Sequence, residues 1–103
     1  MKIMDLGLKG KRAIVTGGNR GIGRCCALAL AREGARVCIA ARNRELLDKT
    51  VGEIHEVAGE GHAVAADLSA LESCQEVVNE AVDKLGGVDI LVNCAGAAKG
   101  GDI

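Results

Sequence analysis

Short apolar runs rich in β-branched residues alternate with longer amphipathic stretches along this chain. Buried parallel strands read as short continuous apolar runs, whereas helices repeat apolar residues at intervals of three and four positions. The strands that this pattern predicts are residues 12–16, 36–41, 62–66 and 89–93. Helices are predicted between them, over residues 21–33, 44–58 and 69–85.

Repeated strand–helix–strand units demand a parallel sheet with right-handed crossovers. The fold class predicted is therefore α/β, a Rossmann-type doubly wound parallel sheet of about four strands in the order 3-2-1-4, with three helices. The first two helices are expected on one face of the sheet and the third on the other. At 103 residues the chain has room for one domain.

The expected helices carry boundary and packing signals. Asn43 suits the position that caps a helix amino terminus, and Ser69 with Glu72 forms an S-x-x-E capping box. The apolar spacing also predicts which side chains face the sheet. They are Ile22, Cys26, Ala29 and Leu30 in the first helix, Leu47, Val51, Ile54 and Ala58 in the second, and Leu71, Cys74, Val78, Ala81 and Leu85 in the third.

Composition excludes several classes of function. Hydrophobic residues make up 49% and charged residues 26% of the chain, and the net charge of -1 gives no general attraction to nucleic acid or anionic membranes. The sequence has no apolar run long enough to span a bilayer and no signal-peptide core near its start, so a cytoplasmic location is expected. Five cysteines without C-x-x-C spacing are expected to be mostly small buried hydrophobes, and no metal site is predicted.

The stretch TGGNRGIG, residues 16–23, joins the first predicted strand to the first predicted helix. Ligands bind at this carboxyl edge in open α/β sheets. Gly17 permits a tight turn, Gly21 lets a phosphate approach the helix amino terminus, and Gly23 lets the helix pack closely on the sheet. Because the spacing is neither G-x-G-x-x-G nor that of a G-K-[ST] phosphate loop, a purely structural turn stays open as an alternative.

This stretch resembles the T-G-x-x-x-G-x-G cofactor motif of the short-chain dehydrogenases/reductases. Asp67-Leu68, after the third strand, looks like the family's adenine-contacting Asp, and the segment NCAG at 93–96 is similar to its N-N-A-G segment. The three motifs follow the expected strands in order. Residues 1–103 thus resemble a partial NAD(P)-binding Rossmann domain, closest in look to 3-oxoacyl-[acyl-carrier-protein] reductase-like members. Cys94 replaces the family's second Asn, so only a contact through backbone atoms carries over there.

The resemblance implies a role for each matching residue. Glycines line the pyrophosphate, Asp67 accepts from the adenine amino group, and the residues after the fourth strand border the adenine ribose. An Asp at this place is also a common turn residue, and that alternative stays open. The cofactor-binding residues predicted are Gly17, Asn19, Arg20, Gly21, Ile22, Gly23, Arg42, Asp67, Leu68, Asn93, Ala95 and Gly96.

The choice between NADP and NAD follows from the end of the second strand. A carboxylate there would bond the ribose 2′-hydroxyl of NAD and repel a 2′-phosphate. This chain has Ala41 at that position and Arg42 next to it, and Arg20 adds a second cation before Gly21. An arginine fork suits phosphate oxygens, so NADP is favoured over NAD, although each arginine singly is equally well a solvated charge.

The resemblance implies hydride transfer between the nicotinamide and a carbonyl or alcohol carbon, with a Tyr, a Lys and a Ser as catalytic residues. These 103 residues contain no tyrosine, so no catalytic residue is assigned and activity of the chain as an enzyme stays open. The function expected is the cofactor-binding N-terminal part of an NADP(H)-dependent oxidoreductase, inactive alone. The alternative is a non-catalytic dinucleotide-binding or interaction module. The fourth strand is expected to expose an apolar edge through which the chain self-associates.

Overall fold

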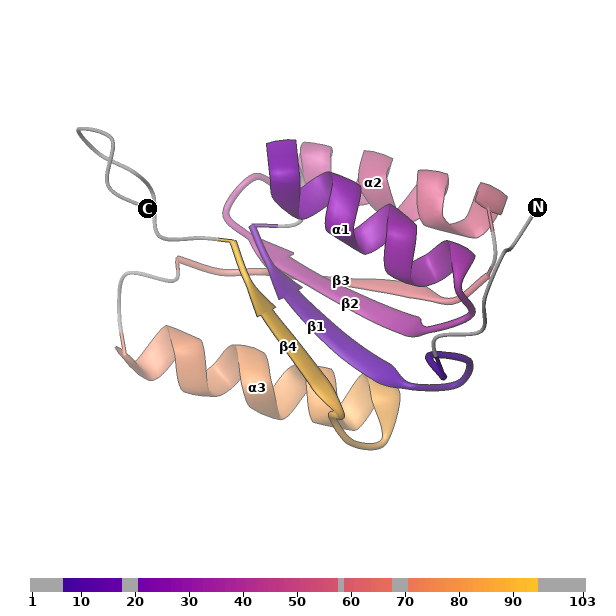
Figure 1. The fold of residues 1–103 in the computed structure, drawn as a ribbon. Helices are drawn as coiled ribbons and strands as arrows, with labels where there is room; N and C mark the ends of the chain where they lie inside the picture. Colours follow the sequence, from indigo (N-terminus) through magenta and orange to yellow (C-terminus); the bar gives the residue numbers. More distant parts are fainter. Residues whose placement is uncertain (1–6, 18–20, 58, 68–70, 95–103) are drawn as a thin grey trace.

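The fold is known from a computed structural model, which describes residues 7–17, 21–57, 59–67 and 71–94. Strands and helices alternate throughout (Figure 1). The elements are β1 (Arg12–Thr16), α1 (Gly21–Arg32), β2 (Arg36–Ala41), α2 (Arg44–Val57), β3 (Gly61–Ala65), α3 (Leu71–Leu85) and β4 (Ile90–Asn93). The third and fourth strands begin one residue away from the predicted starts, which is within the ordinary uncertainty of element ends.

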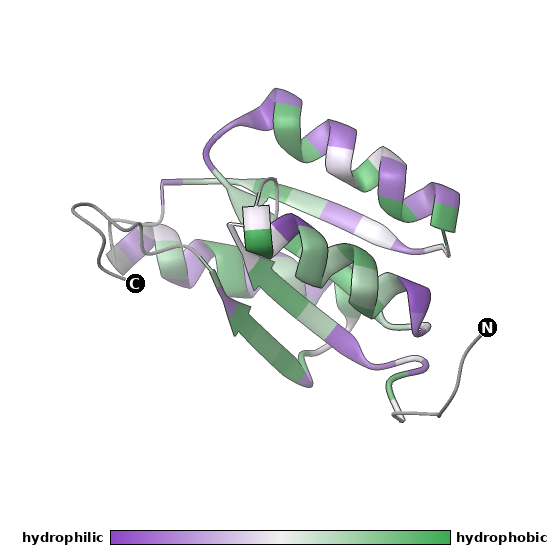
Figure 2. Ribbon diagram, turned by 45° about the horizontal axis from the view of Figure 1, so that its top comes forward, coloured by the Kyte–Doolittle hydropathy of each residue, from purple (hydrophilic) through white to green (hydrophobic). Residues whose placement is uncertain are grey.

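The four strands form one parallel sheet in the order β3-β2-β1-β4, which confirms the predicted topology. Helices α1 and α2 cover one face of the sheet and α3 lies on the other (Figure 1). The central strands are hydrophobic along most of their length (Figure 2), because both of their faces are covered. None of the helices in the described ranges is long and apolar enough to cross a membrane.

Alternate residues of the strands build two separate cores. Val15, Val37 and Ile39 face α1 and α2, where they pack with Leu47 and Ile54 of α2. On the opposite face, the core under α3 consists of Ile14, Cys38, Ala40, Val64, Val77, Ala81 and Leu85. The two cores are separate because neighbouring side chains of a strand point to opposite faces of the sheet.

Helix α1 turns a different side toward the sheet than predicted. Its buried residues are Gly23, Ala27 and Ala31, whereas Ile22 is 76% exposed and Ala29 is exposed. The prediction that Ile22 and Ala29 face inward is therefore wrong. Nearly every position in the first half of α1 is apolar or glycine, so periodicity alone does not fix its rotation. The smallest side chains take the contact face because they allow the closest packing.

Helix α2 matches its prediction. Leu47 and Ile54 are fully buried and Val51 packs against the same core, while Ala58 lies outside the described residues. Asn43 caps the helix: its Oδ1 accepts a hydrogen bond from the backbone N of Leu46 at 3.0 Å.

Helix α3 departs from its predicted face at one position. Val77, Ala81 and Leu85 are buried, as predicted for the last two, whereas Val78 is 48% exposed. The prediction that Val78 faces inward is wrong, because two adjacent valines give a hydrophobic pattern that fits either rotation. The predicted capping residue Ser69 and the side chain of Leu71 lie outside the described part of the chain.

The cysteines do not share one environment. Cys38 is buried, Cys25 is exposed, and the remaining three, Cys26, Cys74 and Cys94, are half-buried. Burial raises the pKa of the Cys38 thiol to about 11, so it stays protonated at neutral pH. The expectation of buried hydrophobes thus holds fully for Cys38 and is wrong for Cys25.

Candidate functional site

The glycine turn leaves the carboxyl end of β1 and leads into α1. Gly17 has φ of 73° and Gly21 has φ of 58°, both in the left-handed region where a side chain is disfavoured. The backbone N of Gly17 donates to the carbonyl oxygen of Ala40 at 2.6 Å, which holds the start of the turn against β2. Asn19 and Arg20, predicted here as cofactor contacts, lie outside the described residues.

Gly23 packs directly against this turn. A Cβ atom at Gly23 would stand 2.2 Å from the carbonyl oxygen of Gly17 and 2.8 Å from its carbonyl carbon. Distances this short leave no room for any side chain, so the close packing predicted for this glycine is present. The first turn of α1 and the glycine turn are consequently one packed unit.

The amino terminus of α1 opens toward solvent beside this turn. Gly21 and Ile22 are exposed, and a Cβ at Gly21 would meet nothing within 4 Å. The first turn of α1 carries no acidic residue, so no carboxylate of its own offsets the positive end of the helix dipole. The first N–H groups of a helix have no partner within the helix and lie at its positive dipole end. The amino terminus of α1 therefore offers a phosphate-sized anion open space, hydrogen-bond donors and a favourable dipole.

The carboxyl end of β2 lies beside the glycine turn. Thr16 pairs with Ala40 in the sheet register, so the next residues, Gly17 and Ala41, stand at the same level. Ala41 is 8% exposed and has no polar group to offer, whereas Arg42 is exposed. The position at which a carboxylate would distinguish NAD is therefore a small buried apolar side chain followed by a cation.

Asp67 is brought to the same edge through the continuation of β3. The backbone N of Ala66 donates to the carbonyl oxygen of Ala41 at 2.9 Å, which sets Asp67 next to the β2 end that carries Arg42. Asp67 is exposed, and Leu68 lies outside the described residues.

The end of β4 completes the edge. Thr16 Oγ1 donates to Asn93 Oδ1 at 2.8 Å, and the backbone N of Cys94 donates to the carbonyl oxygen of Thr16 at 3.0 Å. Thr16 therefore orients Asn93, a role that the sequence analysis did not assign to it. The sequence signal for this role was the position of Thr16 at the end of a strand, directly before Gly17. Ala95 and Gly96 lie outside the described residues.

Two ion pairs lie at the opposite edge of the sheet, where the strands have their amino ends. Arg12 Nε lies 2.9 Å from Asp89 Oδ2, and Arg36 Nε lies 2.8 Å from Glu60 Oε1. Hydrogen bonds from Arg36 lower the pKa of Glu60 to about 2, and those from Arg12 hold the pKa of Asp89 well below its usual range. These arginines are matched by carboxylates, so this edge has a structural role.

The predicted residues that the structure describes therefore meet at one edge. Gly17, Gly21, Gly23, Arg42 and Asn93 come from three separate strand ends, with Asp67 beside them. Such convergence at the carboxyl ends of parallel strands, next to the point where strand order reverses, defines the nucleotide-binding edge of a doubly wound α/β protein. In the described ranges, no group of three His, Cys, Asp or Glu side chains is arranged to hold a metal ion.

Comparison with known proteins identifies the family within this class. The family described as short chain dehydrogenase matches residues 11–103. The chain belongs to the short-chain dehydrogenase/reductase family.

Individual relatives agree with this assignment. A short chain dehydrogenase of Pseudocercospora fijiensis is 43% identical over 96 residues, which are 93% of this chain and 31% of the relative. The crystal structure of a short chain dehydrogenase from Burkholderia cenocepacia in complex with NADP is 39% identical, with a TM-score of 0.84 over 89% of this chain and 38% of that one.

A second crystal structure, of an NADH-dependent reductase complexed with NAD, is 35% identical, with a TM-score of 0.85 over 92% of this chain and 40% of that one. The chain thus spans about a third of the length of the curated relatives that it matches. Of these two structures, one is a complex with NADP and the other a complex with NAD.

Proposed function

We propose that this chain is the cofactor-binding part of an NADP(H)-dependent oxidoreductase that transfers hydride between the nicotinamide and a carbonyl or alcohol carbon. Residues 1–103 make up the first part of its Rossmann domain. When bound, the dinucleotide supplies or accepts the hydride. The residues of this chain bind and orient it: the glycine turn and the amino terminus of α1 receive the pyrophosphate. Gly23 supports this fit, because a side chain there would fill the turn that the phosphates approach.

The remaining predicted residues have the roles that the family resemblance implies. Asn19, Arg20 and Ile22 flank the phosphates and ribose, Asp67 and Leu68 contact the adenine, and Asn93, Ala95 and Gly96 border its ribose. All five cysteines are free thiols, whether buried, half-buried or exposed. Free thiols are typical of a reducing compartment, so we place the protein in the cytoplasm.

The observation that carries the preference for NADP is the pair Ala41 and Arg42. Ala41 leaves no carboxylate to bond a 2′-hydroxyl. Arg42 is exposed where β2 ends beside Gly17, and within the described residues its guanidinium forms no ion pair with a carboxylate. A planar guanidinium suits the oxygens of a 2′-phosphate, and its charge offsets that of the phosphate.

The test is calorimetric titration of the chain with NADPH and with NADH. We expect NADPH to bind at least about tenfold more tightly, since a charge-assisted contact contributes about 1.5–3 kcal/mol. Ala41→Asp should reverse the preference, because a carboxylate repels the 2′-phosphate. Arg44→Ala, which removes an exposed arginine at the start of α2, serves as the matched control and should change neither affinity. Equal affinity for both cofactors in the unsubstituted chain would refute the proposal.

We further propose that these 103 residues bind the dinucleotide without turning it over. The proton donor that the family resemblance implies is a tyrosine, and the chain contains none. NADPH consumption with a panel of ketones and aldehydes should stay at background. Turnover that persists through purification and is lost in Cys94→Ser would contradict this, because it would make the thiol of Cys94 the proton donor.

A further inference from the structure

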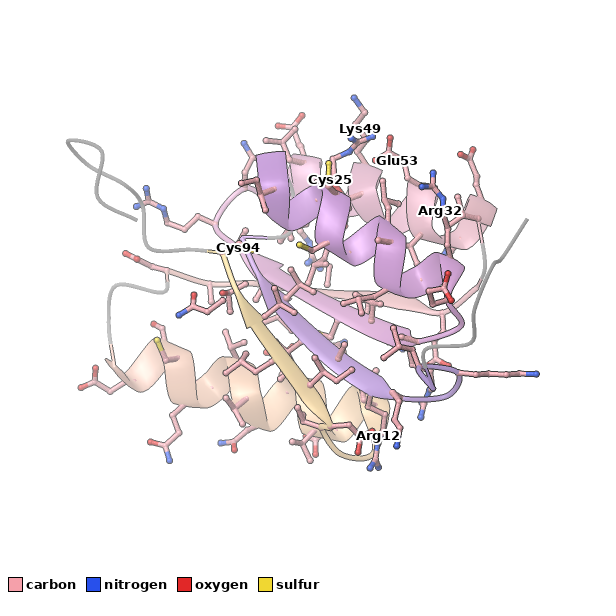
Figure 3. The ribbon with its side chains drawn as sticks, in the orientation of Figure 1. Arg12, Cys25, Arg32, Lys49, Glu53 and Cys94 are labelled. Carbon is pink, nitrogen blue, oxygen red and sulfur yellow. The ribbon has the colours of Figure 1, made fainter. Side chains whose placement is uncertain are left out.

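Two of the half-buried cysteines, Cys26 and Cys94, lie against each other across the packed unit formed by the glycine turn and α1. Cys94 follows β4 directly, and its backbone N continues the sheet ladder to the carbonyl oxygen of Thr16. Figure 3 labels Cys94 at this end of β4, beneath α1. A Cβ at Gly23 would stand 3.2 Å from the Cβ of Cys94.

Cys26 follows Gly23 by three positions on α1. Side chains three positions apart share one side of a helix, so Cys26 stands on the side of α1 that approaches Cys94. Burial and the neighbouring Cys26 thiol both raise the pKa of the Cys94 thiol, which agrees with the two side chains lying close together. The neighbouring Cys25 lies elsewhere: it is exposed and points outward from α1 (Figure 3). The contact is thus specific to one pair among the five free cysteines.

We propose that Cys26 and Cys94 form a reversible dithiol–disulfide site that links the first turns of α1 to the end of β4. The oxidant is a low-molecular-weight disulfide of the glutathione class. One protein thiolate attacks the oxidant and releases one small thiol, which leaves a mixed disulfide on the protein. The second protein thiolate then attacks that protein sulfur, forms the intramolecular bond and releases the second small thiol. Two protein thiols are oxidised and one small disulfide is reduced to two thiols.

The bond has a mechanical consequence for the glycine turn. A disulfide joins its sulfurs at about 2.05 Å, far closer than two thiols in non-bonded contact, so oxidation draws α1 toward β4. Helix α1 already lies close to the turn at Gly23, where an added Cβ would meet the carbonyl of Gly17. We therefore expect oxidation to shift the turn. If the turn binds a dinucleotide, as proposed above, the oxidised chain binds NADPH several-fold more weakly.

The rate of oxidation should depend on pH. Burial, together with the adjacent Cys26, raises the pKa of the Cys94 thiol. Thiolates rather than thiols carry out the exchange, so bond formation should accelerate as the pH rises from neutral toward that raised pKa.

The first experiment treats the folded 103-residue chain with oxidised glutathione and maps disulfides by mass spectrometry of peptides. We expect the Cys26–Cys94 linkage to exceed every other pair by about tenfold, because contact in the folded state gives this pair a high effective concentration. The same oxidation in denaturant should lose this selectivity. A different dominant pair, or the same distribution in folded and unfolded chain, would overturn the proposal.

Substitution provides the second arm. Cys26→Ala and Cys94→Ala should each abolish the linkage, and the exposed Cys25→Ala, its sequence neighbour, should leave it intact. Differential alkylation of the unsubstituted chain before and after oxidation gives the same answer if either variant fails to fold. NADPH titration of reduced and oxidised chain then measures the effect on the turn. If the disulfide forms and affinity is unchanged, the mechanical consequence is wrong; if neither form binds NADPH, the proposed function fails while the thiol site stands.

Discussion

At the scale of single residues, Gly23 decides how α1 meets the sheet. Its missing side chain lets the helix pack against the carbonyl of Gly17, whose backbone N is hydrogen-bonded to the carbonyl oxygen of Ala40. Three features of the site depend on this contact: the position of the helix amino terminus, the shape of the glycine turn, and the approach of Cys26 to Cys94.

Gly23→Ala should destabilise the protein and weaken NADPH binding. The added methyl group meets backbone atoms that have nowhere to move, and overpacking of this kind costs about 1–3 kcal/mol. Gly52→Ala is the matched control, because Gly52 lies within α2 and its Cβ would meet nothing within 4 Å. It should raise the free energy of unfolding by up to about 1 kcal/mol. Denaturant unfolding measures both, and equal effects of the two substitutions would contradict this account of Gly23.

At the scale of elements, the two helices that deviate from prediction share a cause. In α1 nearly every early position is apolar or glycine, and in α3 Val77 and Val78 are adjacent, so hydrophobic spacing fits more than one rotation. Tertiary packing selects one of them. In α1 the contact needs small residues, and in α3 the buried residues recur every four positions from Val77 to Leu85.

The rotation of α3 gives a paired prediction. Val77 is 2% exposed and Val78 is 48% exposed, so the same Val→Ala change tests both sides of one helix. Val77→Ala should lower the free energy of unfolding by about 1–3 kcal/mol through lost burial and a residual cavity. Val78→Ala should stay within about 0.5 kcal/mol of the unsubstituted chain. Thermal or denaturant unfolding decides between them, and a larger loss at Val78 would restore the prediction that Val78 is the buried valine.

The strands were easier to predict than the helix faces. Strand order and the parallel arrangement follow from element order and crossover handedness alone. The glycines of the turn and the strand-end positions of Arg42, Asp67 and Asn93 also follow from the sequence, because parallel strands bring their carboxyl ends to one edge. The bond from Thr16 to Asn93 and the contact between Cys26 and Cys94 depend on side-chain geometry across distant segments, which no local pattern encodes.

At the scale of the whole molecule, β4 is an edge strand with an exposed apolar side chain. Leu91 pairs with Ile14 in the sheet and so points to the same face, the one on which α3 lies. Ile14 is buried under α3, but Leu91 is 64% exposed. In the ranges that the structure describes, β4 pairs with β1 alone, so its second edge has no strand beside it. An exposed apolar strand edge is a template for association.

We therefore expect the 103-residue chain to self-associate, and Leu91→Lys to reduce that association. A charge on the apolar face of an edge strand opposes edge-to-edge pairing. Size-exclusion chromatography with light scattering at several concentrations is the measurement. Val78→Lys, on exposed α3 surface, is the control and should leave the mass distribution unchanged. A monodisperse monomer for the unsubstituted chain would contradict the expectation.

The central claim is that the carboxyl edge of the sheet binds a nicotinamide dinucleotide. The most direct test is the change in backbone amide resonances of the isotope-labelled chain on addition of NADPH. We predict the largest changes at Gly17, Gly21 and Arg42, with Arg36 and Gly86 at the amino edge unaffected. The absence of any change at saturating NADPH, or changes centred on the amino edge, would contradict the claim.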